Sequence, residues 1–397
     1  MIRKILGATI AATGYGSVER SPREREYLVK LRGEANARHI TDTSQRFVRF
    51  LEHTKAQYDD YVAGRRPDPP IIDFLIVSGG GDWGAFGAGF LKGWGGIPNT
   101  DALARPEFGI VTGVSTGALI APFAFLGDAQ SYEQIVHLYR NPHPDWVKQR
   151  GYLYFLPNNV SFAEVPGLER EVRSMVTLEM ATRLAGAENN GRMLVVNTTN
   201  LDDASPRVFH LVSEARRAIQ TGDLSRLHSI MLASAGIPGA FPYREIDGEM
   251  YVDGAVTANI IYGGRIGEED SLPAVWQKRY PDLPIPKLRY WVIFNNQLHA
   301  LPTVVRARWV DIITRSIEQA TRSGSLMDMR HLFAMAEISR LKRKADVEVR
   351  IVAIPDDWSP PVAGVFVKET MNDLADLGER MGADPSSWSM QPPPPWI

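Results

Sequence analysis

The chain has 397 residues, of which 44% are hydrophobic and 23% charged, and it contains no cysteine. This composition indicates a folded globular protein and excludes disulfides, thiol catalysis and cysteine metal sites. The formal net charge of -2 gives no reason to expect nucleic acid as a partner. No apolar run reaches the roughly 18 residues of a membrane-spanning helix.

The first residues have some features of a secretory signal. Arg3 and Lys4 precede the short apolar run Ile5–Thr13, but no A-x-A cleavage site follows. A lipoprotein signal would need a cysteine near position 15, which is Tyr15. An ordinary frayed N-terminus is the alternative, so a cytoplasmic and an exported or membrane-associated location both stay open.

Residues 1–66 form a basic extension, with 13 Lys and Arg against 8 Asp and Glu. Ser44 is expected to cap a helix that ends near Val62. A basic amphipathic arm of this kind could make peripheral contact with an anionic membrane surface. The alternative is a helix packed on the domain with a solvated basic face. The loop Arg65–Pro70 then predicts a domain boundary.

After this loop, strand and helix patterns alternate, which favours an α/β domain with a mostly parallel sheet. Two helical patterns are expected between the last two strands, a long surface loop over Tyr262–Pro286, and a Pro-rich tail over Gln391–Ile397. The predicted strands are Ile71–Val77, Phe108–Thr112, Met193–Asn197, a short one in the hairpin Asp247–Val256, Tyr290–Phe294 and Val347–Ile354; the predicted helices between them include Ala85–Trp94 and Ala118–Leu126.

Residues 113–117 (GVSTG) form a G-x-S-x-G motif between a predicted strand and a predicted helix. A nucleophilic serine needs such a sharp turn, and Gly113 and Gly117 give the room and backbone freedom for it. The amides at the start of the helix would lie near the reacting carbonyl. The motif predicts Ser115 as a nucleophile, and an ordinary Gly-rich turn is the alternative.

A second glycine-rich segment, residues 79–84 (GGGDWG), follows the first predicted strand. The amides of Gly79, Gly80 and Gly81 could converge on the oxyanion of acyl transfer, where one donor contributes about 3–4 kcal/mol. The segment also matches the G-x-G-x-x-G of dinucleotide-binding proteins. That alternative needs an acidic residue about 20 positions on, at the end of the next strand, whereas Asp101 precedes that strand.

A third segment, residues 253–255 (DGA), follows a predicted turn, and an isolated Asp-Gly is usually only a turn itself. A Ser-His-Asp hydrolase would place a histidine late in the chain after a strand. Of the 8 histidines only His299 has such a position. No H-E-x-x-H motif is present, which disfavours a zinc hydrolase.

These three segments, in this order, resemble the motifs of the patatin-like phospholipases. Residues 233–242 (ASAGIPGAFP) also resemble the A-S-x-x-x-P block of that family, and the resemblance extends from about Ile71 to Ile354. The oxyanion loop of the family usually reads G-G-G-x-R-G, and this chain has Trp83 at the Arg position.

The resemblance implies a three-layer α/β/α patatin-like fold with a mostly parallel central sheet. It implies a Ser–Asp dyad with Ser115 as nucleophile and Asp253 as base, and it requires no metal or cofactor. The supporting residues are Gly84, Gly113, Gly117 and Gly254 around the motifs, with the oxyanion hole formed by Gly79, Gly80 and Gly81.

The expected activity is hydrolysis of carboxylic esters in phospholipids or acylglycerols. The alternatives are a catalytically silent lipid- or membrane-surface binding module and a dinucleotide-binding oxidoreductase. The expected organisation is an N-terminal extension over 1–66, a catalytic domain over 67–355, and a C-terminal helix with a Pro-rich tail over 356–397. Four aromatic residues at helical spacing could line an acyl groove or pack in the core: Trp83, Phe86, Phe90 and Trp94.

Overall fold

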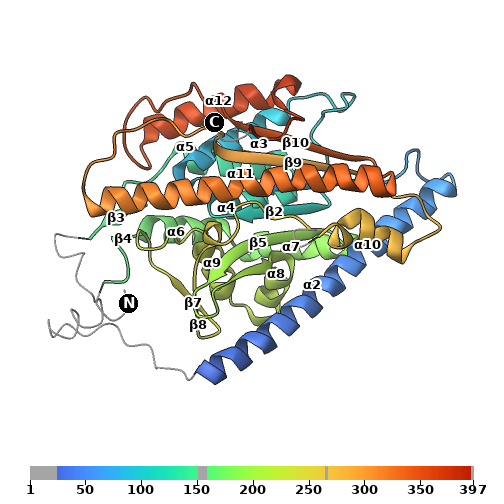
Figure 1. Cartoon of the computed structure of the whole chain (residues 1–397), viewed down its shortest axis with the longest axis horizontal. Helices are drawn as coiled ribbons and strands as arrows, with labels where there is room; N and C mark the ends of the chain where they lie inside the picture. The colour runs from blue at the N-terminus through green and yellow to red at the C-terminus, as the bar shows by residue number, and fades with distance from the viewer. Residues whose placement is uncertain (1–24, 151–158, 264–266, 395–397) are drawn as a thin grey trace.

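The computed structural model describes residues 25–150, 159–263 and 267–394, and its centre is one eight-stranded sheet (Figure 1). The neighbouring strands β10, β9, β1, β2 and β5 are parallel, whereas β6, β8 and β7 join antiparallel beyond β5. A separate small hairpin pairs β3 (Lys148–Gln149) with β4 (Ala163–Glu164). The sheet strands are β1 (Ile71–Val77), β2 (Ile110–Val114), β5 (Met193–Asn200), β6 (Ser205–His210), β7 (Arg244–Ile246), β8 (Glu249–Asp253), β9 (Lys287–Gln297) and β10 (Val347–Ile354).

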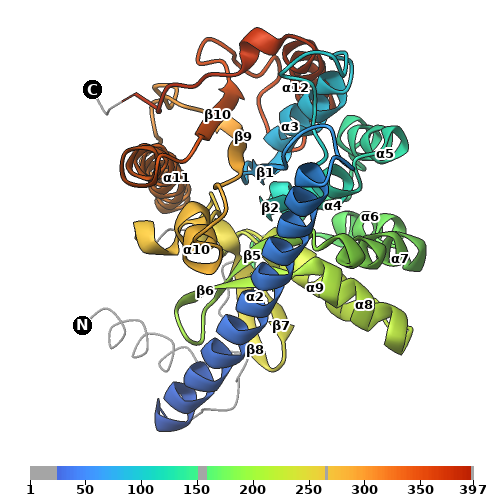
Figure 2. The same cartoon turned by 90° about the vertical axis from the view of Figure 1, so that its right-hand side faces the viewer.

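Helices cover both faces of the sheet, which confirms the expected α/β/α layers (Figure 2). One layer contains α2 (Arg25–Val62), α10 (Leu272–Arg279) and α11 (Trp309–Arg343). The other contains α3 (Gly84–Trp94), α4 (Thr116–Leu126), α5 (Ala129–Arg140), α6 (Pro166–Met175), α7 (Leu178–Gly186), α8 (Leu211–Thr221), α9 (Ser225–Ser234) and α12 (Lys368–Gly382).

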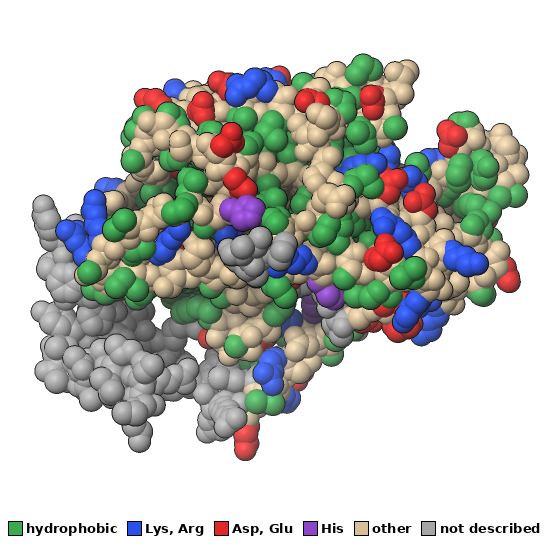
Figure 3. All heavy atoms as spheres, turned by 45° about the horizontal axis from the view of Figure 1, so that its top comes forward, with side chains coloured by type: hydrophobic (Ala, Val, Ile, Leu, Met, Phe, Trp, Pro, Cys, Tyr) green, Lys and Arg blue, Asp and Glu red, His purple; other side chains and the backbone are tan. Residues whose placement is uncertain are grey.

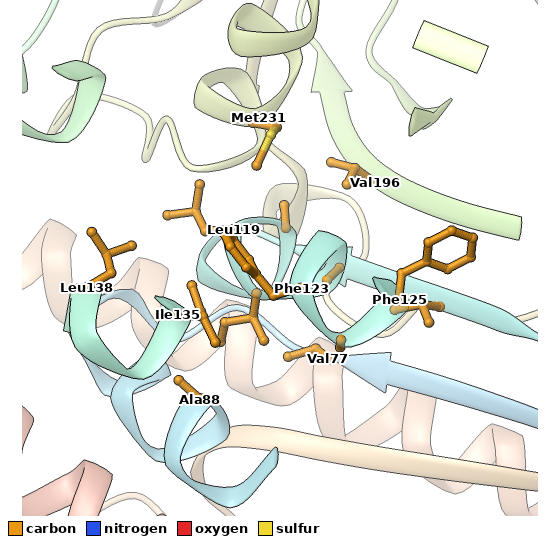
Figure 4. Close-up of a cluster of buried hydrophobic side chains, with 14 of the residues drawn as sticks. Val77, Ala88, Leu119, Phe123, Phe125, Ile135, Leu138, Val196 and Met231 are labelled. Carbon is orange, nitrogen blue, oxygen red and sulfur yellow. The ribbon is translucent and has the colours of Figure 1, made fainter. Parts of the chain in front are cut away.

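Strand β1 contributes side chains to two hydrophobic cores, one on each face of the sheet. Its side chains alternate between the faces, so that Leu75 and Val77 join the core on the α4 side while Phe74 and Ile76 join the core on the α11 side. A strand buried on both faces is apolar at nearly every position. Figure 4 shows the first core around α4, where Leu119 and Phe123 lie between α5, β1 and α9.

Several boundaries differ from the sequence predictions. Helix α2 begins at Arg25 and contains Ser44 in its interior, so the predicted cap is wrong. Strand β2 covers Ile110–Val114, two residues later than expected. The expected loop over 262–286 contains α10, because Trp276 is completely buried and its indole N–H donates to the Pro284 carbonyl at 3.0 Å.

Other differences concern α2, α11 and the aromatic residues of α3. The two helical patterns before β10 are one 35-residue helix, α11. The middle of α2 packs on the sheet through Phe50 and Leu51, which supports the packed-helix alternative for that part of the arm. The aromatic residues of α3 are fully buried and belong to the core; they are Phe86, Phe90 and Trp94.

The signal-like segment 5–13 and the end of the tail, 395–397, lie outside the described residues. Within the described ranges, none of the helices combines the length and apolar character that a bilayer crossing requires.

Candidate active site

Strand β5 brings Ser115 and Asp253 together. Its consecutive residues Asn197 and Thr198 pair with Val114 of β2 and with Asp253 of β8, respectively. Ser115 follows Val114 directly, so the ends of β2 and β8 place the two side chains side by side. The Ser115 hydroxyl donates a hydrogen bond to the Asp253 carboxylate.

Ser115 occupies a strained turn between β2 and α4. Its φ of 54° and ψ of -124° lie in a region that glycine adopts readily and other residues adopt at a cost. The turn is tight because α4 starts directly against β1. A Cβ at Gly117 would lie 2.1 Å from the Val77 carbonyl oxygen, so only glycine fits there. This geometry matches the nucleophile elbow predicted from the G-x-S-x-G motif.

A serine that the motif analysis did not single out supports this turn. The Ser115 N–H donates to the Ser234 hydroxyl at 3.0 Å, and this hydroxyl donates to the Asn197 carbonyl at 2.7 Å. Ser234 is fully buried at the end of α9, and it lies in the ASAGIPGAFP segment. The two bonds connect the turn to β5 and hold its backbone in the strained conformation.

The Asp253 carboxyl group is held in an unusual environment for an acid. It is only 4% exposed, and this burial raises its pKa from 3.8 to about 7. The N–H of Ala255, at 2.8 Å, and the Ser115 hydroxyl act in the opposite direction because they stabilise the charged form. Asp253 therefore titrates near neutral pH and is a stronger base than an ordinary aspartate.

The glycine loop after β1 lies against the Ser115 side chain. A Cβ at Gly79 would be 2.9 Å from the Ser115 Cβ. The Gly79 N–H, however, donates to the Asn259 Oδ1 at 2.6 Å. Within the described part of the chain, the amides of Gly80 and Gly81 have no hydrogen-bond acceptor. Of the three predicted oxyanion donors, these two are the ones free to bind a ligand.

Asn259 is a second polar residue that the sequence analysis missed. It is buried, and while its Oδ1 accepts from the Gly79 N–H, its Nδ2 donates to the Ser325 hydroxyl of α11 at 3.0 Å. No motif marks this residue, because its partners lie 180 and 66 positions away in the chain. It connects the glycine loop to the helix layer on the other face of the sheet.

Asp82 and Trp83 connect the glycine loop to the C-terminal segment. Burial raises the pKa of Asp82, whose carboxylate accepts from the Phe366 N–H at 2.8 Å. The Trp83 ring packs edge-to-face on Trp358, with ring centroids 5.1 Å apart. Trp83, at the usual Arg position of the family, therefore forms an aromatic packing contact with the C-terminal segment.

The remaining sequence candidates lie away from the dyad. His299 is exposed, and its Nδ1 pairs with Asp356 at 2.6 Å and not with Ser115. Asp101 lies in a surface loop before β2, consistent with its rejection as a ribose ligand. Among the described residues, no group of three or more His, Asp or Glu side chains is arranged to hold a metal ion.

The fold and the site together define an α/β protein with a serine at a sharp strand-to-helix turn. The hydroxyl of this serine is hydrogen-bonded to a buried aspartate. Residues 75–263 match the family model of the patatin-like phospholipases. The resemblance seen in the sequence is thus confirmed over the segment that contains all three motifs.

Other comparisons add little to this assignment. No curated protein matches the sequence. Among solved structures, the chain is similar to the crystal structure of VipD from Legionella pneumophila, with 12% sequence identity and a TM-score of 0.29. That match covers 79% of this chain and 67% of the other.

Proposed function

We propose that the protein is a serine-dependent lipid acyl hydrolase that cleaves carboxylic ester bonds of phospholipids or acylglycerols. The match of residues 75–263 to the family model of the patatin-like phospholipases supports the substrate class. The observation that carries the mechanism is the hydrogen bond from the Ser115 hydroxyl to a buried Asp253 whose pKa is about 7. A base with this pKa is half ionised at neutral pH and suits proton transfer there.

In the proposed first half-reaction, the Ser115 Oγ attacks the ester carbonyl carbon while the Asp253 carboxylate accepts the hydroxyl proton. The carbonyl oxygen becomes an oxyanion, which the N–H groups of Gly80 and Gly81 would bind. When the tetrahedral intermediate collapses, the bond to the leaving alcohol breaks and the alcohol takes the proton from Asp253. The acyl group stays on Ser115 as an ester.

In the second half-reaction, water attacks the acyl carbon of the Ser115 ester. Asp253 accepts a proton from this water and then donates it to the Ser115 Oγ as the acyl bond breaks. The products are a free fatty acid and the regenerated hydroxyl. Each donor to the oxyanion would contribute about 3–4 kcal/mol to the lowering of the barrier.

The test is hydrolysis of p-nitrophenyl esters and phospholipids by the wild type, Ser115→Ala and Asp253→Asn. Both variants should lose activity, by a factor of about 10⁴ or more, while circular dichroism shows an intact fold. His299→Ala is the matched control for the alternative base, and it should retain full activity. Activity that survives in Ser115→Ala would contradict the mechanism. A wild type that binds lipid without turnover would favour the silent binding module.

A further inference from the structure

Helix α11 starts at the edge of the sheet that carries Ser115. Strand β9 is parallel to β1, so the two strands end at the same edge, beside the glycine loop. Because β10 is parallel to β9, α11 must run from this edge back to the opposite one. The hydrogen bond between Asn259 and Ser325 identifies the residue of α11 that lies beside the candidate site. Residues of α11 before Ser325 therefore lie farther out along the helix axis than the candidate site.

This first part of α11 is an overhang. Residues 309–324 extend about 24 Å beyond Ser325, at a rise of 1.5 Å per residue. The second part of the helix, in contrast, packs on the sheet through Leu326, Met329 and Leu332. Figure 1 shows the beginning of α11 on the left, beyond the ends of the strands. The overhang thus lies at the candidate catalytic edge, where Arg322 and Arg315 donate to the carbonyl oxygens of Gln297 and Leu301 and the first turns are exposed.

The overhang carries an exposed apolar stripe. Trp309 is 63% exposed, and Ile312 and Ile313 are each 50% exposed. At about 100° per residue Trp309 and Ile313 lie about 160° around the helix from the core-facing Met329, and Ile312 lies about 100° from it. The stripe is therefore not a continuation of the core-facing side. An apolar surface pointing away from the domain indicates an external partner.

Basic residues flank this stripe. Arg306 and Arg308 directly precede α11, and neither forms an ion pair with any described residue. Arg315, by comparison, pairs with Glu318 at 3.4 Å. Figure 3 shows basic and hydrophobic side chains together at the left end of the molecule, where α11 begins in Figure 1. The combination of Trp, Ile and Arg is typical of helices that lie in a membrane interface.

We infer that residues 304–317, which comprise the start of the overhang and the segment before it, dock on the surface of an anionic phospholipid bilayer and turn the edge carrying Ser115 toward the lipid. Trp309 and the isoleucines would enter the boundary between headgroups and acyl chains, and Arg306 and Arg308 would contact anionic headgroups. The choice of lipid as the partner rests on the proposed function. The surface itself is distinct from the basic arm of residues 1–66, whose middle packs on the domain.

Binding is measured separately from catalysis in the Ser115→Ala background of the full chain. The probes are vesicles of phosphatidylcholine with about 30% phosphatidylglycerol, and vesicles of phosphatidylcholine alone. The test variant carries Trp309→Ser, Ile312→Ser and Ile313→Ser. The matched control carries Met327→Ser and Leu341→Ser, exposed apolar residues further along the same helix. We expect the test variant to bind the anionic vesicles at least tenfold more weakly in co-sedimentation, because it lacks three apolar anchors. The control variant should bind like the Ser115→Ala parent.

Catalysis gives a second readout in chains that retain Ser115. The triple substitution should lower hydrolysis of vesicle phospholipid while leaving hydrolysis of soluble p-nitrophenyl butyrate unchanged. Equal vesicle binding by the test variant and its parent would overturn the inference. So would a wild-type dimer that the triple substitution converts to a monomer, because the stripe would then be a self-association surface. Failure of the proposed function would instead show as a wild type that hydrolyses neither ester.

Discussion

The Asn259 carboxamide oxygen lies 2.6 Å from the Gly79 nitrogen and occupies the N–H group that would otherwise be the first oxyanion donor. The position of Gly79 is therefore fixed by this bond, and in the proposed mechanism the oxyanion donors are the N–H groups of Gly80 and Gly81. The Nδ2 of Asn259 donates to the Ser325 hydroxyl, so Asn259 connects the glycine loop to α11. The consequences of this arrangement can be measured.

Asn259→Ala should lower kcat by about 10- to 100-fold with little change in KM, because a loop displaced by about 1 Å no longer aligns its donors. Ser325→Ala is the matched control, since it removes only the bond to α11 and leaves the acceptor for Gly79. It should reduce kcat less than fivefold (about 1 kcal/mol). Kinetics on a soluble ester give both values. Equal effects of the two substitutions would mean that Asn259 acts through α11 and not through Gly79.

The pH dependence of the reaction should reflect Asp253. Its carboxyl must be ionised to accept the Ser115 proton, and burial raises its pKa to about 7. For a soluble ester, kcat/KM should therefore fall about tenfold per pH unit below 7 and level off above it. Circular dichroism at each pH controls for unfolding. A profile that stays flat down to pH 5 would exclude a base with this pKa.

Asp253→Asn should increase the stability of the fold while abolishing activity. An acid with a raised folded-state pKa favours the folded state below its unfolded pKa, and this contribution is lost as the pH rises from 3.8 to about 7. The variant lacks the buried charge, so its stability advantage should grow over this range and then stay constant. Because the folded and unfolded pKa values of Asp253 differ by about 3, the gain in stability has an upper limit of about 4 kcal/mol. Urea unfolding at pH 5 and pH 8 tests this, and a variant less stable than the wild type at pH 8 would contradict it.

Much of the fold could be predicted from the sequence because the parallel strands are buried on both faces. Strand β1, for example, is apolar at six of its seven positions, and its bounds agree with the prediction. Elements with few apolar residues could not be recognised in this way. Strand β6 contains Pro206, Arg207 and His210 and is held by pairing with β5, and α6 buries only Leu168 and Val172 among its larger side chains.

The candidate site was predictable to the extent that it consists of local motifs. Ser115 could be predicted from its glycine-flanked motif, and Asp253 from the resemblance of the DGA segment to the motif of the patatin-like phospholipases. Ser234 and Asn259 could not, because their roles depend on hydrogen bonds to residues 37 to 180 positions away, which only the folded chain brings together. The distribution of roles within the glycine loop depends on the same long-range contacts.

Gly117→Ala should destabilise the protein by about 3 kcal/mol or more, because the new Cβ would meet the carbonyl oxygens of Val77 and Ser78 at 2.1 and 2.7 Å. Backbone atoms of a central strand cannot move aside to make room. Gly324→Ala is the matched control, since a Cβ there meets no described atom within 4 Å outside its own helix turn. It should stabilise α11 by about 0.5–1 kcal/mol. Thermal unfolding distinguishes the two, and a harmless Gly117→Ala would contradict the close approach of α4 to β1.

The strain at Ser115 makes a further prediction about stability. Its φ of 54° with ψ of -124° suits glycine better than any residue with a Cβ. Ser115→Gly should therefore be more stable than Ser115→Ala by about 1 kcal/mol, although both lack the hydroxyl and both should be inactive. The buried Ser339 in the interior of α11 provides the control, because there the order should reverse and Ser339→Ala should be the more stable by about 1 kcal/mol. Chemical denaturation of the four variants measures both differences. If alanine is the more stable residue at both positions, the turn at Ser115 stores no strain, and the bonds through Ser234 are not needed to hold it.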